Sequence, residues 1–302
     1  MTAPETSATF DRLLFPTDGS EGAATALEHV LDIAAEHGST VHVLTVMDTV
    51  LYSPFQMEGD VVDALEREAD RIVRDAADRA EGRGIDAVTA VERGEPYREI
   101  IDYAASHDID LTVMPTHGRR GLERFLLGST TERVVRRADG PVLTIRPDAE
   151  TELTYPYRHV LAPTDGSECA RDALELGVDV ASTTGAALHL LTVVDVVSVG
   201  VDVRSDIKTA MLEAAADEIL DEASSVAETR GVEPAAETVA YESSVQEAIR
   251  SYIEEQDIDL VVVGTHGRTG FDRYVLGSVT EHLIRTAPVP VLTVRESASE
   301  GS

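Results

Sequence analysis

The chain contains two copies of one sequence unit, and this internal repeat restricts its possible folds more than any other feature. The segment LLFPTDGSE at 13–21 recurs as VLAPTDGSE at 160–168. The tetrapeptide THGR at 116–119 recurs at 265–268. A period of about 150 residues is the size of one ordinary domain, so the repeat predicts two domains of the same fold.

Each copy alternates short apolar runs with longer amphipathic segments. The runs RLLFPT, VHVLTVM, AVTAV, DLTVMPT and PVLTIR of the first copy are typical of strands buried on both faces of a parallel sheet. Residues 22–38 carry apolar side chains on one helical face and end at Gly38, and residues 63–84 show a similar pattern. Strand and helix alternate five times per copy, which predicts an α/β fold of two doubly wound, five-stranded parallel-sheet domains in tandem.

The repeat also sets the expected domain limits. We expect one domain at 10–146 and a second at 157–295, because each copy closes with a short apolar strand, PVLTIR at 141–146 and PVLTVR at 290–295. The residues between them, 147–156, have the polar and proline content of a linker.

The composition limits the classes of partner. The formal net charge is −31, from 56 Asp and Glu against 25 Lys and Arg, while 43% of the residues are hydrophobic. The charge argues against nucleic acid and anionic membranes as partners, since phosphate contacts need clustered cations. Periodic apolar runs instead predict a folded protein with an acidic, hydrated surface, as expected for a halophilic archaeon with concentrated internal salt.

Other features of the sequence predict a cytoplasmic protein. The N-terminal stretch MTAPETSATF is neither basic nor apolar, so it is unlike a signal peptide. No apolar run has the length of a membrane span. The single cysteine, Cys169, excludes an intrachain disulfide, and we expect it to act as a small apolar residue in a helix.

The first candidate loop is PTDGS, at Pro16 to Ser20 and again at Pro163 to Ser167. It follows a predicted strand, where the carboxyl ends of parallel strands bind ligands. An Asp at this point, Asp18 or Asp165, can accept a hydrogen bond from a ligand. The alternative is that each Asp only caps the next helix, since Asp-Gly-Ser-Glu is a good helix start.

The second candidate loop joins a strand to a helix and contains spaced glycines. In the second copy they are Gly264, Gly267 and Gly277, followed by Ser278. Glycine allows an anion to approach main-chain N–H groups, and a helix N-terminus favours phosphate. We expect Ser278 to form a capping box with Glu281, whose carboxylate must then fold back on the N-cap N–H group, away from a phosphate. The alternative is a purely structural loop.

Several familiar catalytic motifs are missing from the sequence. It contains neither G-x-x-x-x-G-K-[ST] nor G-x-G-x-x-G, which argues against a Walker-type NTPase and a dinucleotide dehydrogenase. It also lacks a nucleophile elbow and a clustered metal-ligand set. His117 and His266 stand alone in turns, where a bond to backbone is the simpler expectation. We therefore assign no catalytic residue and no metal ligand.

Taken together, these motifs resemble the universal stress protein family in its tandem form. Gly264, Gly267, Gly277 and Ser278 match the family signature G-x2-G-x9-G-[ST] in full, and PTDGSE and the strand ending LTVVD also match. The resemblance covers about residues 10–146 and 157–295, and it implies a Rossmann-like fold of the adenine nucleotide alpha hydrolase type. It also implies pairing of the last strands, first within the chain as a pseudo-dimer and then in a homodimer.

The resemblance implies an ATP site in the second copy, with Mg²⁺ or Mn²⁺ as the accompanying ion. The adenine and ribose side would be formed by the strand-one Pro and Asp and a strand-two Val, and the phosphate side by the glycine loop. The residues carried over are Pro163, Asp165, Val193, Gly264, Gly267, Arg268, Gly277, Ser278 and Thr280.

The first copy departs from the signature at Pro115, which replaces the leading glycine. Proline lacks an N–H group, and its ring is expected to fill space beside the phosphates. We therefore expect weaker or altered binding there. The residues of this weaker candidate site are Pro16, Asp18, Val46, Gly118, Arg119, Gly128, Ser129 and Thr131.

Three functions remain in competition at this point. The first is an ATP-binding module of a stress response, whose nucleotide-loaded state affects a partner or its own assembly. The second is a slow ATPase or phosphotransferase, for which the sequence offers no compelling general base. The third is a nucleotide-free scaffold or chaperone-like protein.

Overall fold

The computed structural model describes residues 10–49, 59–118, 127–147, 153–195, 206–267 and 276–296. Contacts within the chain divide it into two compact units, one from Thr9 to Tyr155 and one that begins at Pro156. We call them the first and second domain. No helix in the described ranges is long and apolar enough to cross a bilayer.

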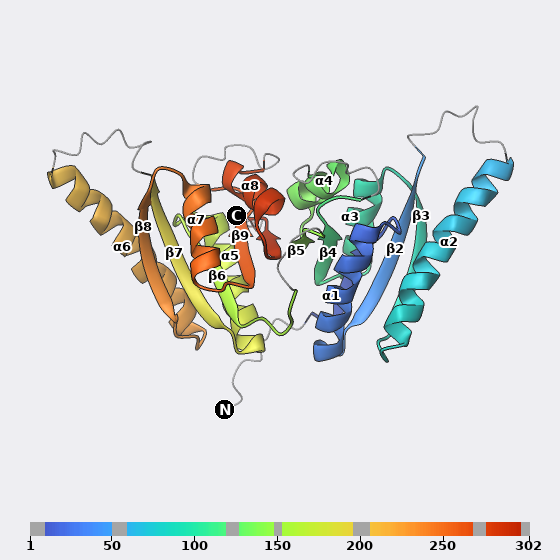
Figure 1. Ribbon diagram of the computed structural model, residues 1–302, viewed down its shortest axis with the longest axis horizontal. Helices are drawn as coiled ribbons and strands as arrows, with labels where there is room; N and C mark the ends of the chain where they lie inside the picture. Colours follow the sequence, from blue (N-terminus) through green and yellow to red (C-terminus); the bar gives the residue numbers. More distant parts are fainter. Residues whose placement is uncertain are drawn as a thin grey trace, which may run out of the picture. The chain divides into compact units, whose positions relative to one another are not determined.

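The first domain contains five strands and four helices in strict alternation (Figure 1). Its elements are β1 (Arg12–Pro16), α1 (Glu21–His37), β2 (Thr40–Asp48), α2 (Gly59–Glu81), β3 (Ala87–Gly94), α3 (Pro96–Ser106), β4 (Leu111–Pro115), α4 (Ser129–Arg137) and β5 (Val142–Ile145).

The second domain repeats this order. Its elements are β6 (His159–Pro163), α5 (Glu168–Thr184), β7 (Ala187–Asp195), α6 (Asp206–Thr229), β8 (Ala236–Glu242), α7 (Val245–Glu255), β9 (Leu260–Gly264), α8 (Ser278–Thr286) and β10 (Val291–Val294). Each domain therefore ends on a strand, with four helices rather than a fifth.

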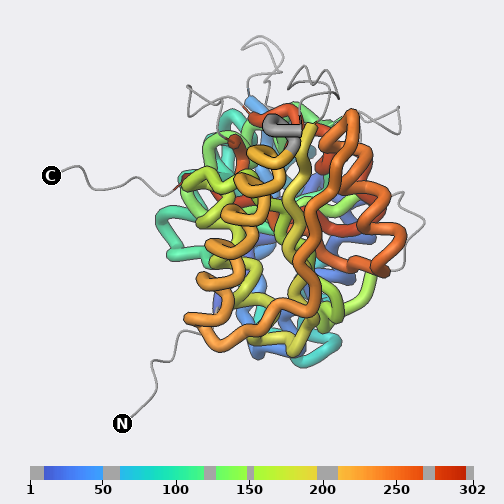
Figure 2. Tube along the Cα trace, turned by 90° about the vertical axis from the view of Figure 1, so that its left-hand side faces the viewer, coloured from blue at the N-terminus to red at the C-terminus, as the bar shows by residue number. Residues whose placement is uncertain are grey.

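All strand pairs within each domain are parallel. The order in the first domain is β3-β2-β1-β4-β5, and that in the second is β8-β7-β6-β9-β10. The chain steps outward in one direction from the first strand and then in the other, and right-handed crossovers place the two helix pairs on opposite faces. Figure 2 shows this for the second domain, where α6 and α7 flank β7 and β8. The predicted doubly wound fold is confirmed.

One edge strand of each domain, β3 or β8, differs from the predicted pattern of burial on both faces. β3 and β8 keep many half-exposed and exposed residues, and Val88 and Tyr241 are among the exposed large side chains. Among the described residues, β3 and β8 have a paired neighbour on one side only and are covered less completely than the central strands β1 and β4. The two-sided burial expected for AVTAV is therefore wrong.

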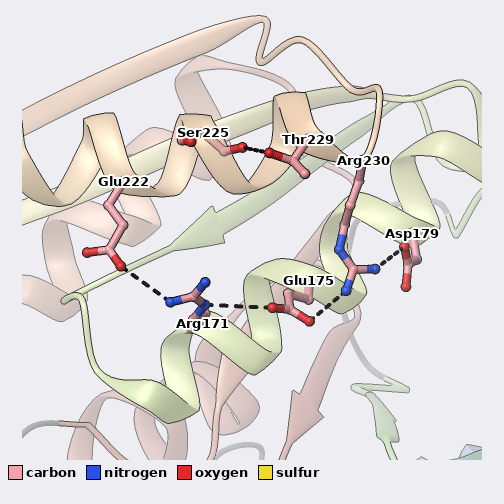
Figure 3. Close-up of polar contacts among 7 residues, drawn as sticks. All are labelled: Arg171, Glu175, Asp179, Glu222, Ser225, Thr229 and Arg230. Atoms are coloured by element: carbon pink, nitrogen blue, oxygen red, sulfur yellow. Dashed lines mark hydrogen bonds and ion pairs between the residues drawn. The ribbon is translucent and has the colours of Figure 1, made fainter.

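The helix pair on one face of each sheet is joined by ion pairs at corresponding positions. In the second domain, Arg230 of the turn after α6 contacts Glu175 at 2.6 Å and Asp179 at 2.8 Å, both on α5 (Figure 3). In the first domain, Arg83 contacts Glu28 and Asp32 in the same way. These side chains are partly exposed, so each pair contributes at most about 1 kcal/mol.

Candidate functional site

The turn after the first strand is built in the same way in both domains. In the second domain, Thr164 N–H donates to the Leu191 carbonyl at 2.9 Å, and the Thr192 hydroxyl donates to the Thr164 carbonyl at 3.1 Å. Asp165 Oδ1 accepts the N–H of Ser167 at 3.0 Å, which closes the turn. The first two strands therefore hold Asp165 in place at the carboxyl end of the sheet.

The helix after this turn is capped by serine rather than by aspartate. Ser167 Oγ accepts the N–H of Ala170 at 3.2 Å, and Ser20 Oγ accepts that of Ala23 at the same distance. The alternative in which Asp18 and Asp165 cap the helix is therefore wrong. Each aspartate shapes the turn instead, with its second carboxylate oxygen directed toward the glycine loop.

That contact explains the second glycine of the signature. A Cβ added to Gly267 would lie 2.6 Å from Asp165 Oδ2, and one added to Gly118 would lie 2.3 Å from Asp18 Oδ2. Glycine allows the carboxylate of one loop to lie against the backbone of the other, and a side chain at this position would force the carboxylate to move. The turn after the first strand and the loop after the fourth strand therefore meet, as the candidate site requires.

The third glycine and a threonine close the loop. Gly277 N–H donates to the Thr265 carbonyl at 2.7 Å, and the Thr280 hydroxyl donates to the Gly264 carbonyl at 2.6 Å. The first domain has the corresponding bonds, from Gly128 to Thr116 at 2.8 Å and from Thr131 to Pro115 at 2.9 Å.

These bonds correct the role expected for the threonines. A hydroxyl has one hydrogen to donate, and Thr280 and Thr131 use theirs on a carbonyl while buried. They therefore cannot also donate to a phosphate. Both are loop-closing residues.

The helix after the loop begins without a side-chain cap. The N-cap of α8 is Gly277, so Ser278 is the first helical residue and makes no capping bond. The same holds for Gly128 and Ser129 at α4. In contrast, α1, α5 and α7 are each capped by a serine side chain. The first N–H groups of α8 are therefore available to an anion, together with the positive end of the helix dipole.

The predicted capping box is consequently wrong. Glu281 pairs with Arg285 one turn further along α8, with 3.3 Å between Oε1 and Nη1, and Glu132 pairs with Arg136 at 3.4 Å in the first domain. The carboxylate of Glu281 is thus directed along the helix toward its C-terminus. The Glu281 carboxylate therefore does not conflict with a phosphate at the N-terminus of α8, although no capping box forms.

The first glycine of the signature, Gly264, is needed for packing within the domain, whereas the sequence suggested that it leaves room for a phosphate. A Cβ on Gly264 would lie 2.7 Å from Sγ of Cys169 and 2.8 Å from its carbonyl oxygen. The space that this glycine leaves is therefore taken up by the start of α5 and not by a ligand. In the first domain Pro115 occurs together with Gly22 in place of Cys169. That the Pro115 ring fills space beside the phosphates of the first domain stays a prediction.

The N–H group of Gly264 remains a real difference between the domains. The N–H groups of Thr265 and Val261 point from β9 toward β10 and donate to carbonyl oxygens there, at 2.8 and 3.1 Å. Because N–H directions alternate along a strand, that of Gly264 faces β6, whose pairing with β9 ends at Val261. Pro115 offers no N–H at the corresponding point.

His266 lies between two signature residues, and its contacts were not foreseen. Its Nδ1 lies 3.2 Å from Thr265 Oγ1 and its Nε2 lies 3.0 Å from Glu296 Oε2, with the ring buried. The expected bond to backbone is therefore wrong. The residue in the position of Glu296 in the first domain is Pro147, and His117 contacts Thr116 at 3.2 Å.

The remaining predicted residues fall in three places. Val193 and Val46 are half-buried near the ends of β7 and β2, and Pro163 and Pro16 end β6 and β1. Arg268 and Arg119 lie outside the described residues. A cavity of about 150 Å³ lies between α5 and α6, beside the turn that follows β6. Its lining includes none of the predicted site residues. Within the described ranges, no group of His, Cys, Asp and Glu is arranged to hold a metal ion.

Comparison with known proteins decides the family. The sequence profile of the Universal stress protein family matches twice, over residues 9–146 and 156–295. The chain belongs to the universal stress protein family. Its tandem form is shared with a universal stress protein of Mycolicibacterium smegmatis, which is 29% identical over 308 residues, covering 96% of this chain and 98% of that protein.

Two further relatives support the assignment. A universal stress protein of Methanocaldococcus jannaschii is 34% identical over 140 residues, covering 45% of this chain and 82% of that protein. A crystal structure of a universal stress protein from Archaeoglobus fulgidus superposes with a TM-score of 0.71 at 27% identity, over 95% of this chain and 99% of that one.

Proposed function

We propose that this universal stress protein binds ATP in its second domain and acts as a nucleotide-dependent module of a stress response in the cytoplasm of a salt-tolerant cell. The observation that carries the proposal is the start of α8. Its N-cap is a glycine without a side-chain bond, and the glycine loop before it contacts the Asp165 carboxylate. A phosphate is the group that fits an uncapped helix N-terminus beside a glycine loop.

Each residue has a distinct role in this proposal. Gly267 and the first N–H groups of α8 would bind the phosphates, with the hydroxyl of Ser278 as an added donor. Gly277, whose own N–H closes the loop, would leave room for the phosphates beside its backbone. Asp165, Pro163 and Val193 would form the adenine and ribose side, where the Asp165 carboxylate can accept a hydrogen bond from the sugar. Thr280 would hold the loop closed rather than touch the nucleotide.

A divalent ion fits this site only as a companion of the nucleotide. Mg²⁺ commonly keeps several waters and binds through substrate phosphates, and the described residues offer no cage of their own. The ion would neutralise phosphate charge. Neither hydrolysis nor a nucleotide-free scaffold gains a specific observation from the described residues.

The first domain would bind nucleotide more weakly. It has the uncapped helix and the Asp18–Gly118 contact but lacks the N–H group that Gly264 provides. From the family resemblance, we further propose that the last strands pair, within the chain as a pseudo-dimer or between two chains.

A pair of matched variants tests the site. Ser278→Glu and Ser129→Glu each place a carboxylate at the first position of an uncapped helix. A negative charge there favours the helix itself but repels a phosphate. We expect about one ATP bound per chain in the presence of Mg²⁺, lost in Ser278→Glu and retained in Ser129→Glu, as measured by equilibrium dialysis.

Three results would contradict the proposal. One is the absence of adenine nucleotide after denaturation of freshly purified protein, together with no binding of added ATP. A second is loss of binding in Ser129→Glu alone, which would place the site in the first domain. A third is unchanged binding in both variants, which would show that neither helix N-terminus holds the phosphates.

A further inference from the structure

Three arginines surround one tyrosine on the surface of the first domain. Tyr97, near the start of α3, is buried, and the guanidinium groups of Arg98, Arg133 and Arg137 lie over its ring at 5.7, 5.1 and 5.0 Å from the centroid. We call Tyr97 and these three residues the arginine cluster. It joins the first turn of α3 to the outer face of α4.

Hydrogen bonds fix the cluster in position. The Tyr97 hydroxyl accepts from Arg98 Nε at 3.0 Å and from Arg137 Nη1 at 2.9 Å. Glu95 accepts from Arg133 Nη1 at 2.7 Å and lies 3.0 Å from Arg98 Nε. Cation–π contact with the ring further offsets the repulsion between the guanidinium groups.

The cluster keeps unused hydrogen-bonding capacity. A guanidinium has five N–H donors in a fork that matches a carboxylate or phosphate. Among the described residues, Arg98 uses only Nε and Arg133 only Nη1, while their side chains are 65% and 48% exposed. Arg98 and Arg133 share the carboxylate of Glu95, in a chain whose net charge is −31.

The fold itself does not require these residues. The counterparts in the second domain, found by the shift of 149 residues between α4 and α8, have a different chemistry. Tyr97, Arg98, Arg133 and Arg137 correspond to Gln246, Glu247, His282 and Thr286. The second domain packs α7 against α8 without them.

We propose that the arginine cluster is a docking surface for a short acidic segment of a partner protein. Two ordered guanidinium forks with open donors favour bidentate bonds to carboxylates. The exposure of Arg98 and Arg133 places these donors on open surface, which suits a peptide segment lying across α3 and α4. The acidic charge of the whole chain disfavours nucleic acid as the partner.

A labelled hexaglutamate peptide probes this surface directly. Fluorescence anisotropy would be measured at the lowest salt concentration at which the circular dichroism spectrum stays native, about 0.1 M. Charges still interact over about 10 Å at that concentration. The test variant is Arg98→Gln with Arg133→Gln. The matched control is Arg71→Gln with Arg74→Gln on α2, which removes the same charge from exposed, paired arginines.

We expect the test variant to weaken peptide binding by about tenfold or more, and the control by less than about twofold. No binding to wild-type protein, or an equal loss in both variants, would overturn the proposal. Tighter binding of a DNA duplex than of the peptide would overturn the choice of partner. So would self-association in sedimentation that the test variant abolishes, since the partner would then be a second copy of this chain.

Discussion

Thr131 of the first domain and Thr280 of the second each donate a hydroxyl hydrogen to the carbonyl of the residue that ends the fourth strand of its domain. That residue is Pro115 in one domain and Gly264 in the other. The bonds from Gly128 and Gly277 that close the loops are also the same. The two domains thus keep the same loop closure around a residue that differs.

The differences lie among the neighbours of the loop. Gly264 accompanies Cys169, whereas Pro115 accompanies Gly22, and His266 has Glu296 where the first domain has Pro147. A Cβ on Gly22 would lie 2.8 Å from Pro147 Cγ, so Gly22 faces the residue that replaces Glu296. The divergence of the domains is therefore best understood as a set of changes at neighbouring positions and not as damage at one signature position.

Substitution of Gly264 by proline should have the largest effect on stability and on nucleotide binding. Gly264→Pro brings a ring against the sulfur and backbone of Cys169, and overpacking of this kind costs about 3 kcal/mol. Hydrogen exchange with mass spectrometry, which follows each domain separately, should show reduced protection of β9 and β10. Loss of the backbone N–H group should also weaken ATP binding in the second domain toward that of the first.

Two controls separate these causes. Gly264→Ala adds the Cβ but keeps the N–H group, so it should destabilise the domain without the same loss of binding. Cys169→Gly combined with Gly264→Pro recreates the pair of the first domain and should recover about 1 kcal/mol or more through coupling. Additive effects would show that the two residues do not form an exchanged pair.

Helix α1 contains a second difference, which should make the first domain the more acid-sensitive. His29 is 1% exposed, and burial lowers its pKa from 6.5 to about 4, against a smaller opposing effect of Asp32. Its counterpart in α5 is Leu176. Above pH 6.5 both folded and unfolded states hold a neutral imidazole. As the pH falls from 6.5 toward 4, the unfolded chain takes up the proton first, so stability is lost.

We expect this histidine to cost the first domain about 2 kcal/mol between pH 7 and pH 5. His29→Leu, which copies the second domain, should remove that part of the pH dependence, as measured by the protection of α1 against hydrogen exchange. An unchanged pH profile in His29→Leu would show that the imidazole is protonated equally in both states.

The backbone of each domain could be predicted because its signals are local. The predicted helix at 22–38 is α1 at Glu21–His37, ended by Gly38 with φ of 68°, and the predicted strand runs correspond to β1 to β5 within a few residues. Apolar runs and a helix stop need no knowledge of neighbours. The exposure of β3 depends instead on strand order, which a run such as AVTAV does not contain.

The contacts of the site could be predicted less completely, because they depend on residues far apart in the sequence. The loops that would hold a ligand were found from their glycines, but the partner of each glycine lies far away in the sequence. Cys169 lies 95 residues before Gly264, as their numbers show, and Glu296 follows the last strand. A comparison of the two copies contained one usable signal, since Cys169 and Gly264 both change in the first copy.

The pair of His266 and Glu296 should give a smaller effect, confined to the second domain. Glu296→Gln exchanges the carboxylate that contacts the buried ring for a neutral amide, which weakens this bond by about 1 kcal/mol. We expect weaker ATP binding, because the ring lies between Thr265 and Gly267. Glu281→Gln changes a carboxylate that pairs with Arg285 on the helix surface, and it should leave both stability and binding nearly unchanged. Equal effects of the two variants would remove the special role of His266.

The smallest effect distinguishes the two kinds of helix start. Ser20→Ala and Ser167→Ala each remove a side-chain cap and should destabilise their own domain by about 1 kcal/mol. Ser129→Ala and Ser278→Ala change first helical residues that make no capping bond, so we expect less than about 0.5 kcal/mol. Urea unfolding of the four variants measures this directly. A cost at Ser278 as large as that at Ser167 would mean that its hydroxyl already serves the helix, and it would remove the argument that the start of α8 is open to a phosphate.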